Sequence, residues 1–163
     1  MTNEQITKTT QNQKPIAQQK EGLQNLTRQQ VSEALLNLRG FVGFAQRQVI
    51  SVLSRGEERS FFYGKLIEIE NIVATMPKTY ETDGQGSQAV AHLHYFTANA
   101  DWYITESDSM FEQLQAFGMA DLGYEGELGY ISIVELIKNG AELDLHWTPK
   151  TLGEIKSEKA MNN

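Results

Sequence analysis

The sequence predicts an α+β fold, and two observations support that class. Apolar residues recur at the three- and four-residue spacing of helices as far as Pro77, and at the two-residue spacing of strands after Gln88. A sheet of short strands must cover one face, and the helices are the cover that the sequence supplies. We therefore expect an N-terminal helical hairpin packed on a mainly antiparallel sheet of about five short strands.

Residues 1–26 differ in composition from the rest of the chain. Half of this segment is glutamine, threonine or asparagine, and large apolar side chains are few and scattered. Such a composition buries too little surface to offset the entropy of ordering the chain. We predict a disordered tail over 1–26 and a single α+β domain over 27–163.

A long amphipathic pattern begins after Thr27, which with Gln30 has the spacing of a capping box. The pattern predicts a helix over 28–54. Its apolar residues follow at alternating intervals of four and three: Val31, Leu35, Leu38, Val42, Ala45, Val49 and Val52. Gly40 and Gly43 lie within this segment and weaken a helix. Either another backbone approaches closely there, or the helix breaks near residue 40.

A second amphipathic segment follows and ends at Pro77. Ser54 and Glu57 repeat the capping-box spacing at its start. Its apolar stripe consists of Phe62, Leu66, Ile69, Val73 and Met76. The two segments predict a helical hairpin over 27–77 with its turn at 54–56. This hairpin is either a core scaffold or, because the first helix is apolar on more than one side, a homodimer surface.

The sheet-containing part spans 89–155 and follows a polar connector. The predicted strands are 89–97, 101–106, 111–118, 127–133 and 141–147. Ser132 as a cap and Gly140 as a stop predict a short helix at 133–139. A last helical turn begins at Thr148 or Pro149 and fades before the polar C-terminal residues.

Composition excludes several classes of protein. The chain has no cysteine, which removes disulfides, thiolate metal sites and cysteine nucleophiles. It has no apolar run long enough to span a bilayer and no signal-peptide pattern. We expect a cytoplasmic protein without a membrane partner. No nucleophile or phosphate-binding motif of specific spacing is present, so we predict no catalytic residue and no cofactor.

Charge is distributed unevenly along the chain. Residues 1–60 contain eight Lys and Arg against five Asp and Glu, whereas residues 61–163 contain six against sixteen. The acidic part favours a protein partner with a basic surface, or simple solubility, and disfavours nucleic acid. Four aromatic residues there could stack on single-stranded nucleic acid, but the same negative charge opposes it: Tyr95, Trp102, Tyr103 and Trp147.

One metal-site hypothesis comes from the first strand pair. A three-residue loop at 98–100 would place His94 opposite Ile104 and His92 opposite Glu106 on one face. Two imidazoles and a carboxylate are ligands that a divalent metal can use. The alternative is histidines packed in a half-buried sheet. A change of one residue in the loop would instead pair His92 with Thr105.

Acidic residues also gather in a glycine-flanked loop after the third predicted strand. Asp121, Glu125 and Glu127, with Tyr124 between them, are candidate binding residues because this loop is expected to be exposed. They lack the alternating spacing of a calcium loop. The alternative is a solvated acidic rim.

The C-terminal part also resembles a known family. The sequences LHYF, DWYIT, FG and ELGYIS, within about 80 residues from MPKTYETDGQG onward, are similar to an uncharacterised domain-of-unknown-function family of bacterial conjugative plasmids and integrative elements. The resemblance implies a small α+β domain in an accessory protein of a mobile genetic element, found near antirestriction genes. It implies no catalytic residues.

Two functions follow as hypotheses. The first is an accessory protein that binds another macromolecule, with a counter-defence role such as antirestriction. The second is a metal-dependent hydrolase or nuclease that uses His92, His94 and Glu106.

Overall fold

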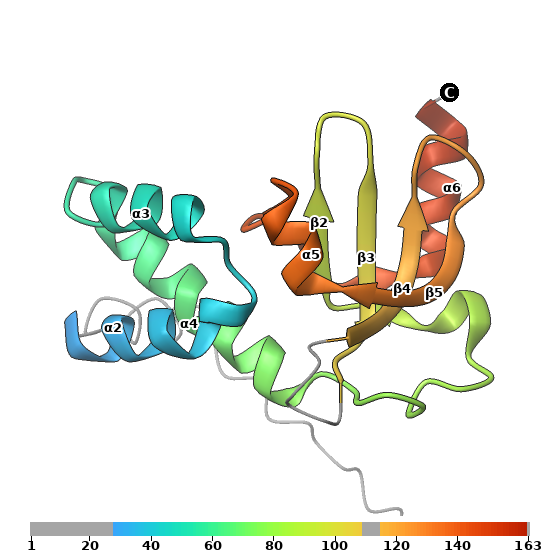
Figure 1. Cartoon of the computed structure of the whole chain (residues 1–163), viewed down its shortest axis with the longest axis horizontal. Helices are drawn as coiled ribbons and strands as arrows, with labels where there is room; N and C mark the ends of the chain where they lie inside the picture. The colour runs from blue at the N-terminus through green and yellow to red at the C-terminus, as the bar shows by residue number, and fades with distance from the viewer. Residues whose placement is uncertain (1–27, 109–114, 163) are drawn as a thin grey trace, which may run out of the picture.

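The computed structural model describes residues 28–108 and 115–162, and it has the predicted α+β architecture (Figure 1). Helices dominate the N-terminal part, and strands begin at residue 90. The tail predicted over 1–26 lies outside the described residues. So does the first half, 111–114, of the strand predicted over 111–118.

The predicted helix over 28–54 is broken, as one of the two alternatives for its glycines allowed. Helix α2 (Arg28–Asn37) continues into the short 3-10 helix η1 (Leu38–Gly40), and α3 (Phe44–Leu53) begins after Gly43. A Cβ atom on Gly43 would lie 3.1 Å from the side chain of Ile137. The neighbour of Gly43 is thus a side chain and not another backbone, so the helix break is the alternative that the structure shows.

The next helix, α4 (Arg59–Thr75), packs against α2 and α3. Ser54 was predicted to cap its start, but it ends α3 instead, because its N–H and hydroxyl both donate to the Ile50 carbonyl. The predicted hairpin over 27–77 is thus a group of three helices with a turn at 54–58.

Five antiparallel strands form the main sheet in the order β5-β4-β3-β2-β6. Their bounds are β2 (Leu93–Phe96), β3 (Asp101–Glu106), β4 (Gln115–Asp121), β5 (Glu127–Ser132) and β6 (Glu142–Leu143). A second sheet pairs β1 (Val90–Ala91) with β7 (Lys150–Thr151). The strand predicted over 89–97 is therefore two strands in different sheets, and the strand predicted over 141–147 is shorter.

Helix α5 (Ile133–Lys138) begins as predicted, because the Ser132 hydroxyl accepts the Glu135 N–H at 3.3 Å. The C-terminal prediction is wrong. Helix α6 (Leu152–Asn162) runs for 11 residues. Its start is a capping box, in which Thr151 Oγ1 accepts the Glu154 N–H and Glu154 Oε2 accepts the Thr151 N–H.

The main sheet is covered on both faces, whereas the sequence predicted a cover on one. One face, with Tyr95 and Ile104, packs against the N-terminal helices and α5. On the other face, Tyr103 and Met119 pack against Leu152 and Ile155 of α6, which lies behind the sheet in Figure 1. The chain is thus layered as helices, sheet and helix.

Candidate functional site

The predicted register of the β2–β3 hairpin is wrong by one residue. His94 pairs with Tyr103 rather than with Ile104. The connecting loop has four residues, 97–100, and the Thr97 N–H closes it by donating to the Ala100 carbonyl at 2.9 Å. A shift of one residue exchanges the two faces of a strand relative to its partner.

The structure does not bring His92, His94 and Glu106 together. His92 lies between β1 and β2, where burial lowers the pKa of its imidazole. The ring nitrogens of His94 contact two aspartates, and the Glu106 carboxylate binds the loop at 78–85. Within the described parts of the chain, no group of three or more His, Asp or Glu side chains could hold a metal ion. The geometry behind the hydrolase hypothesis is therefore absent there.

Glu106 fixes the conformation of the loop after α4, which the sequence predicts only as a polar connector. It is 3% exposed, and its carboxylate accepts the N–H groups of Tyr80 and Thr82, at 2.9 and 2.8 Å, and the Thr82 hydroxyl. Tyr80 consequently has a φ of 74°, which is rare for a large side chain. The buried carboxylate thus holds Tyr80 in a strained conformation, and the tyrosine residue is 68% exposed.

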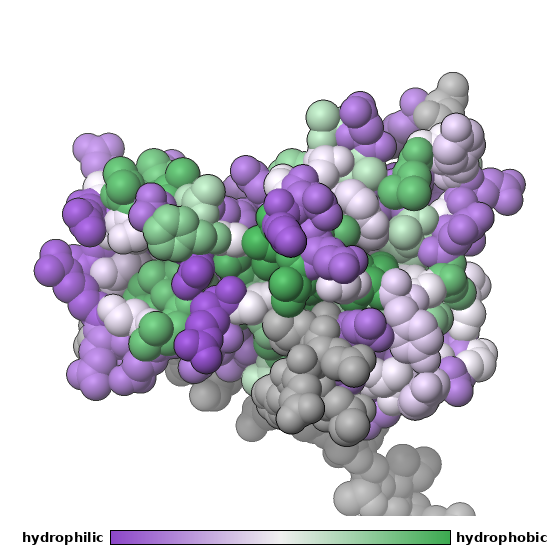
Figure 2. Space-filling view, viewed as in Figure 1, coloured by the Kyte–Doolittle hydropathy of each residue, from purple (hydrophilic) through white to green (hydrophobic). Residues whose placement is uncertain are grey.

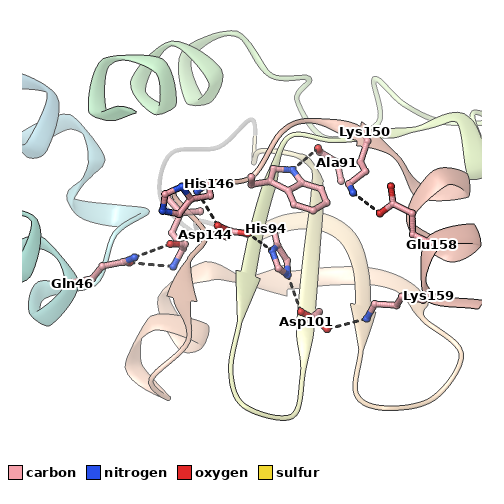
Figure 3. A network of polar contacts seen from close by, with 11 residues as sticks. Gln46, Ala91, His94, Asp101, Asp144, His146, Lys150, Glu158 and Lys159 are labelled. Carbon is pink, nitrogen blue, oxygen red and sulfur yellow. Dashed lines mark hydrogen bonds and ion pairs between the residues drawn. The ribbon is translucent and has the colours of Figure 1, made fainter. Parts of the chain in front are cut away.

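A charged network centred on His94 lies on the face of the sheet beneath α6 (Figure 3). His94 Nε2 is 2.8 Å from Asp101 Oδ1, and His94 Nδ1 is 3.1 Å from Asp144 Oδ2. A neutral imidazole carries one N–H, so this ring can donate to both ionised carboxylates only when it is protonated.

Lys159 of α6 connects the network to the helix. Its Nζ donates to Asp101 Oδ2 at 2.9 Å and to Asp121 Oδ2 at 2.7 Å. Burial opposes the charge of Lys159, but these bonds raise its pKa above the usual value. The same bond from Lys159 holds the pKa of Asp121 below its usual range. Asp101 therefore bridges the histidine and the lysine, as Figure 3 shows.

Aromatic rings enclose these charges. The His94 ring stacks on Tyr103, with centroids 4.8 Å apart, and lies 4.9 Å from the Trp147 ring. Lys159 Nζ is 5.3 Å from the Tyr103 centroid, within the range of a cation–π contact. Each charged group of the network is thus partnered, and the network acts as a polar cross-link between the sheet and α6.

The aromatic residues considered for nucleic-acid stacking are not exposed platforms. Tyr95 is fully buried, and its hydroxyl donates to the Phe41 carbonyl at 2.7 Å, which joins the sheet to the segment before α3. Tyr103 is 4% exposed. Trp147 is half-buried, and its Nε1 donates to the Ala91 carbonyl at 3.0 Å.

The four predicted binding residues fall into two groups. Asp121 is buried and paired with Lys159, so the prediction that it is exposed is wrong. Glu125 and Glu127 are exposed, and Tyr124 is 86% exposed. The loop between β4 and β5 therefore presents two carboxylates and a tyrosine to solvent.

An exposed aromatic pair that the sequence did not reveal lies towards the other end of β5. The hydroxyls of Tyr80 and Tyr130 are 3.0 Å apart, although the residues are fifty positions apart in the chain. This hydrogen bond, with the nearby charges of Asp83 and Glu106, raises the pKa of Tyr130. Leu128, on the same strand as Tyr130, is 52% exposed. We call Tyr80, Tyr124, Leu128 and Tyr130, with Asp83, Glu125 and Glu127, the acidic–aromatic rim.

Comparison with known proteins identifies the family. A model described as protein of unknown function (DUF2958) matches residues 66–149, which are 84 of the 163 residues. The chain belongs to the DUF2958 family. The expected membership of a domain-of-unknown-function family is thus confirmed. The DUF2958 match includes the whole rim but ends before Lys159 and α6. Searches of curated proteins and of solved structures found no match.

Lys159, Asp101 and Asp144 were not predicted as members of a site. The capping box of Thr151 and Glu154 was the available signal, because it predicts a helix in which Lys159 follows Leu152 and Ile155 on one stripe.

Among residues 28–108 and 115–162, no helix is both long and apolar enough to cross a membrane.

Proposed function

We propose that this DUF2958 protein acts by binding another macromolecule, and that the partner is a protein with a basic surface. The observation that carries the proposal is the acidic–aromatic rim. In residues 78–88 and 121–132 the exposed acids are Glu81, Asp83, Glu125 and Glu127, and the single basic residue is Lys78. Exposed aromatic and acidic side chains of this kind suit arginine- and lysine-bearing partners, through cation–π contacts and charge complementarity.

The biological setting is a further part of this proposal. The LHYF, DWYIT and ELGYIS sequences resemble accessory proteins of conjugative plasmids and integrative elements. We infer that the protein belongs to such an element in a bacterial cytoplasm and blunts a host defence system such as restriction. A nucleic-acid partner is disfavoured, because the rim would repel phosphate groups.

A binding experiment on a rim variant tests the proposal. Protein partners are purified on the full chain from a plasmid-bearing bacterial host, identified and then expressed. Association is measured for the wild type and for E125Q/E127Q at low and high salt. We expect association with the partner to slow in the variant at low salt and the difference to shrink at high salt, because exposed charges are screened over about 8 Å.

Glu57 and Glu58 provide a matched control. Both are exposed and lie in the turn between α3 and α4, away from the rim. E57Q/E58Q removes the same number of charges and should leave the association rate unchanged. The proposal fails if no macromolecule binds the wild type, or if both variants slow association equally.

A homodimer through the N-terminal helices also stays a proposal, and α3 is the surface that supports it. Only Ile50 of this helix is buried. Phe44, Val49 and Val52 are each more than half exposed, and Figure 2 shows hydrophobic residues gathered at this end of the molecule. Exposed apolar groups of this kind are typical of an interaction surface.

A further inference from the structure

The two edge strands of the main sheet, β6 and β5, differ in whether their outward backbone groups have hydrogen-bond partners. Edge strands carry backbone N–H and C=O groups that point away from the sheet and can pair with another chain. At the β6 edge, Gln46 of α3 occupies these groups: its Nε2 donates to the Leu143 carbonyl at 2.7 Å, and its Oε1 accepts the Leu143 N–H at 3.1 Å. A side-chain amide thus substitutes there for a neighbouring strand.

The β5 edge has no such cap among the described residues. Apart from the start of α5 at Ser132, the backbone of β5 hydrogen-bonds there only to β4. Every second residue of an antiparallel edge strand points its backbone donor and acceptor outward. The sequence ELGYIS also lacks the lysine or proline that commonly protects an edge. As far as residues 28–108 and 115–162 show, the β5 edge is therefore open to strand pairing.

The side chains around this edge indicate what kind of strand it accepts. Tyr130 and Leu128 are more than half exposed, and Tyr80 stands beside Tyr130, held by the buried Glu106. Gly129 has open space where a Cβ would be. Exposed carboxylates lie on both elements, since Glu127 begins the strand and Asp83 is on the loop that carries Tyr80. An incoming strand therefore meets aromatic rings and carboxylates.

We propose that the partner protein adds an extended, basic segment to β5 as a sixth strand of the main sheet. Backbone hydrogen bonds to the outer edge of β5 supply affinity, and lysine or arginine side chains over Tyr80 and Tyr130 supply specificity. This inference rests on the proposed function, because it names the binding mode at the same rim. In this arrangement Gln46 caps the β6 edge, and Glu106 holds Tyr80 beside the open β5 edge.

The test uses a displayed library of random linear heptapeptides selected against the full chain. We expect enriched peptides with lysine or arginine and with β-branched or aromatic residues at alternate positions. Their binding should shift the backbone amide signals of β5 and slow hydrogen exchange there. No enrichment, or signals that shift elsewhere only, would overturn the proposal.

Backbone N-methylation of an enriched peptide separates strand pairing from charge attraction. Methylating alternate amides on one edge of the peptide removes the donors that face β5, whereas methylating the other set leaves them. We expect one methylated peptide to lose at least about tenfold in affinity and the other to bind normally, because several backbone hydrogen bonds are lost together. Equal binding of both peptides would exclude strand addition.

Competition distinguishes this inference from the proposed function. The enriched peptide should displace the natural partner, and E125Q/E127Q should weaken peptide binding about three- to tenfold while E57Q/E58Q does not. A partner that binds the rim but is not displaced would refute strand addition and leave the proposed function standing. A wild-type chain that binds peptide but no macromolecule would refute the proposed function.

Discussion

Lys159 is the residue on which the charged network depends. It is a single cation between two carboxylates, and the side chain of Asp121 is only 11% exposed. Removing one partner of a half-buried ion pair leaves the other charge poorly solvated, which costs more than the pair itself contributes. The position is thus sensitive to loss of charge, although it lies near the end of an otherwise polar helix.

We predict that K159M lowers the free energy of unfolding at pH 7 by about 1–3 kcal/mol. The control is K156M on the same helix, where Lys156 is exposed, and it should change stability by less than about 0.5 kcal/mol. Urea unfolding followed by circular dichroism measures both. Equal stability of K159M and the wild type would show that the network does not stabilise the fold.

The pH dependence of this stabilisation has a definite sign. Asp121 has a pKa below its ordinary value of 3.8 in the folded protein, so the unfolded chain binds more protons as the pH falls. The contribution of Asp121 is therefore present above about pH 4 and is lost as the pH falls through the folded pKa. Lys159 has a raised pKa, so its contribution is fully present below its ordinary 10.5 and is lost as the pH rises from there through the raised folded pKa.

We accordingly predict that the stability difference between the wild type and K159M is constant from about pH 5 to pH 9 and shrinks below about pH 4. Urea midpoints measured across this range decide the matter. A difference that grows on acidification would assign the effect of Lys159 to something other than its pairing with Asp121.

At the scale of single elements, hydrophobic period predicts which segments are helices or strands, but it does not predict how the strands pair. The periods of three to four and of two identified most helices and strands, because each follows from a covered face. Register depended on the 97–100 loop, where one extra residue places His94 opposite Tyr103. No period reveals that residue, since Thr97 can end a strand or begin a turn equally well. The candidate metal site failed for this reason.

Helix α6 was missed for a different reason. Only Leu152 and Ile155 of this helix are buried, so its apolar pattern is too short to predict a helix of this length. The capping box and the Lys159 ion pairs add polar contacts to the packing of these two residues. The site under α6 could therefore not be found from hydrophobic pattern alone. Asp101 and Asp144 likewise became neighbours of His94 only through strand pairing.

Gln46 provides a prediction at the same scale. Q46A removes both hydrogen bonds to Leu143 and should destabilise the fold by about 1–3 kcal/mol, because two backbone groups lose their partner. Q48A, at an exposed position of the same helix, is the control. Amide exchange of Leu143 should accelerate in Q46A only. Unchanged exchange would mean that the β6 edge does not need this cap.

At the scale of the whole molecule, the chain is polarised between apolar helices and an acidic sheet. If α3 forms a homodimer, V49E/V52E should make the protein monomeric, because two buried charges at the contact are not compensated. N71E, at an exposed position of α4, adds negative charge elsewhere and should not alter the mass. Light scattering at increasing concentration measures both. A wild type that stays monomeric throughout would reject the homodimer.

The limits of the family match separate elements that pack against one another in the structure. It begins within α4 and ends before β7 and α6, so the matched residues keep Asp101, Asp121 and Asp144 but not Lys159. A fragment cut to 66–149 would carry these three aspartates without the lysine and would expose Tyr103 and Met119 to water. The segment that matches the family model is thus shorter than the segment that forms the packed fold. Expression trials on DUF2958 proteins should accordingly retain the flanking helices and not the matched segment alone.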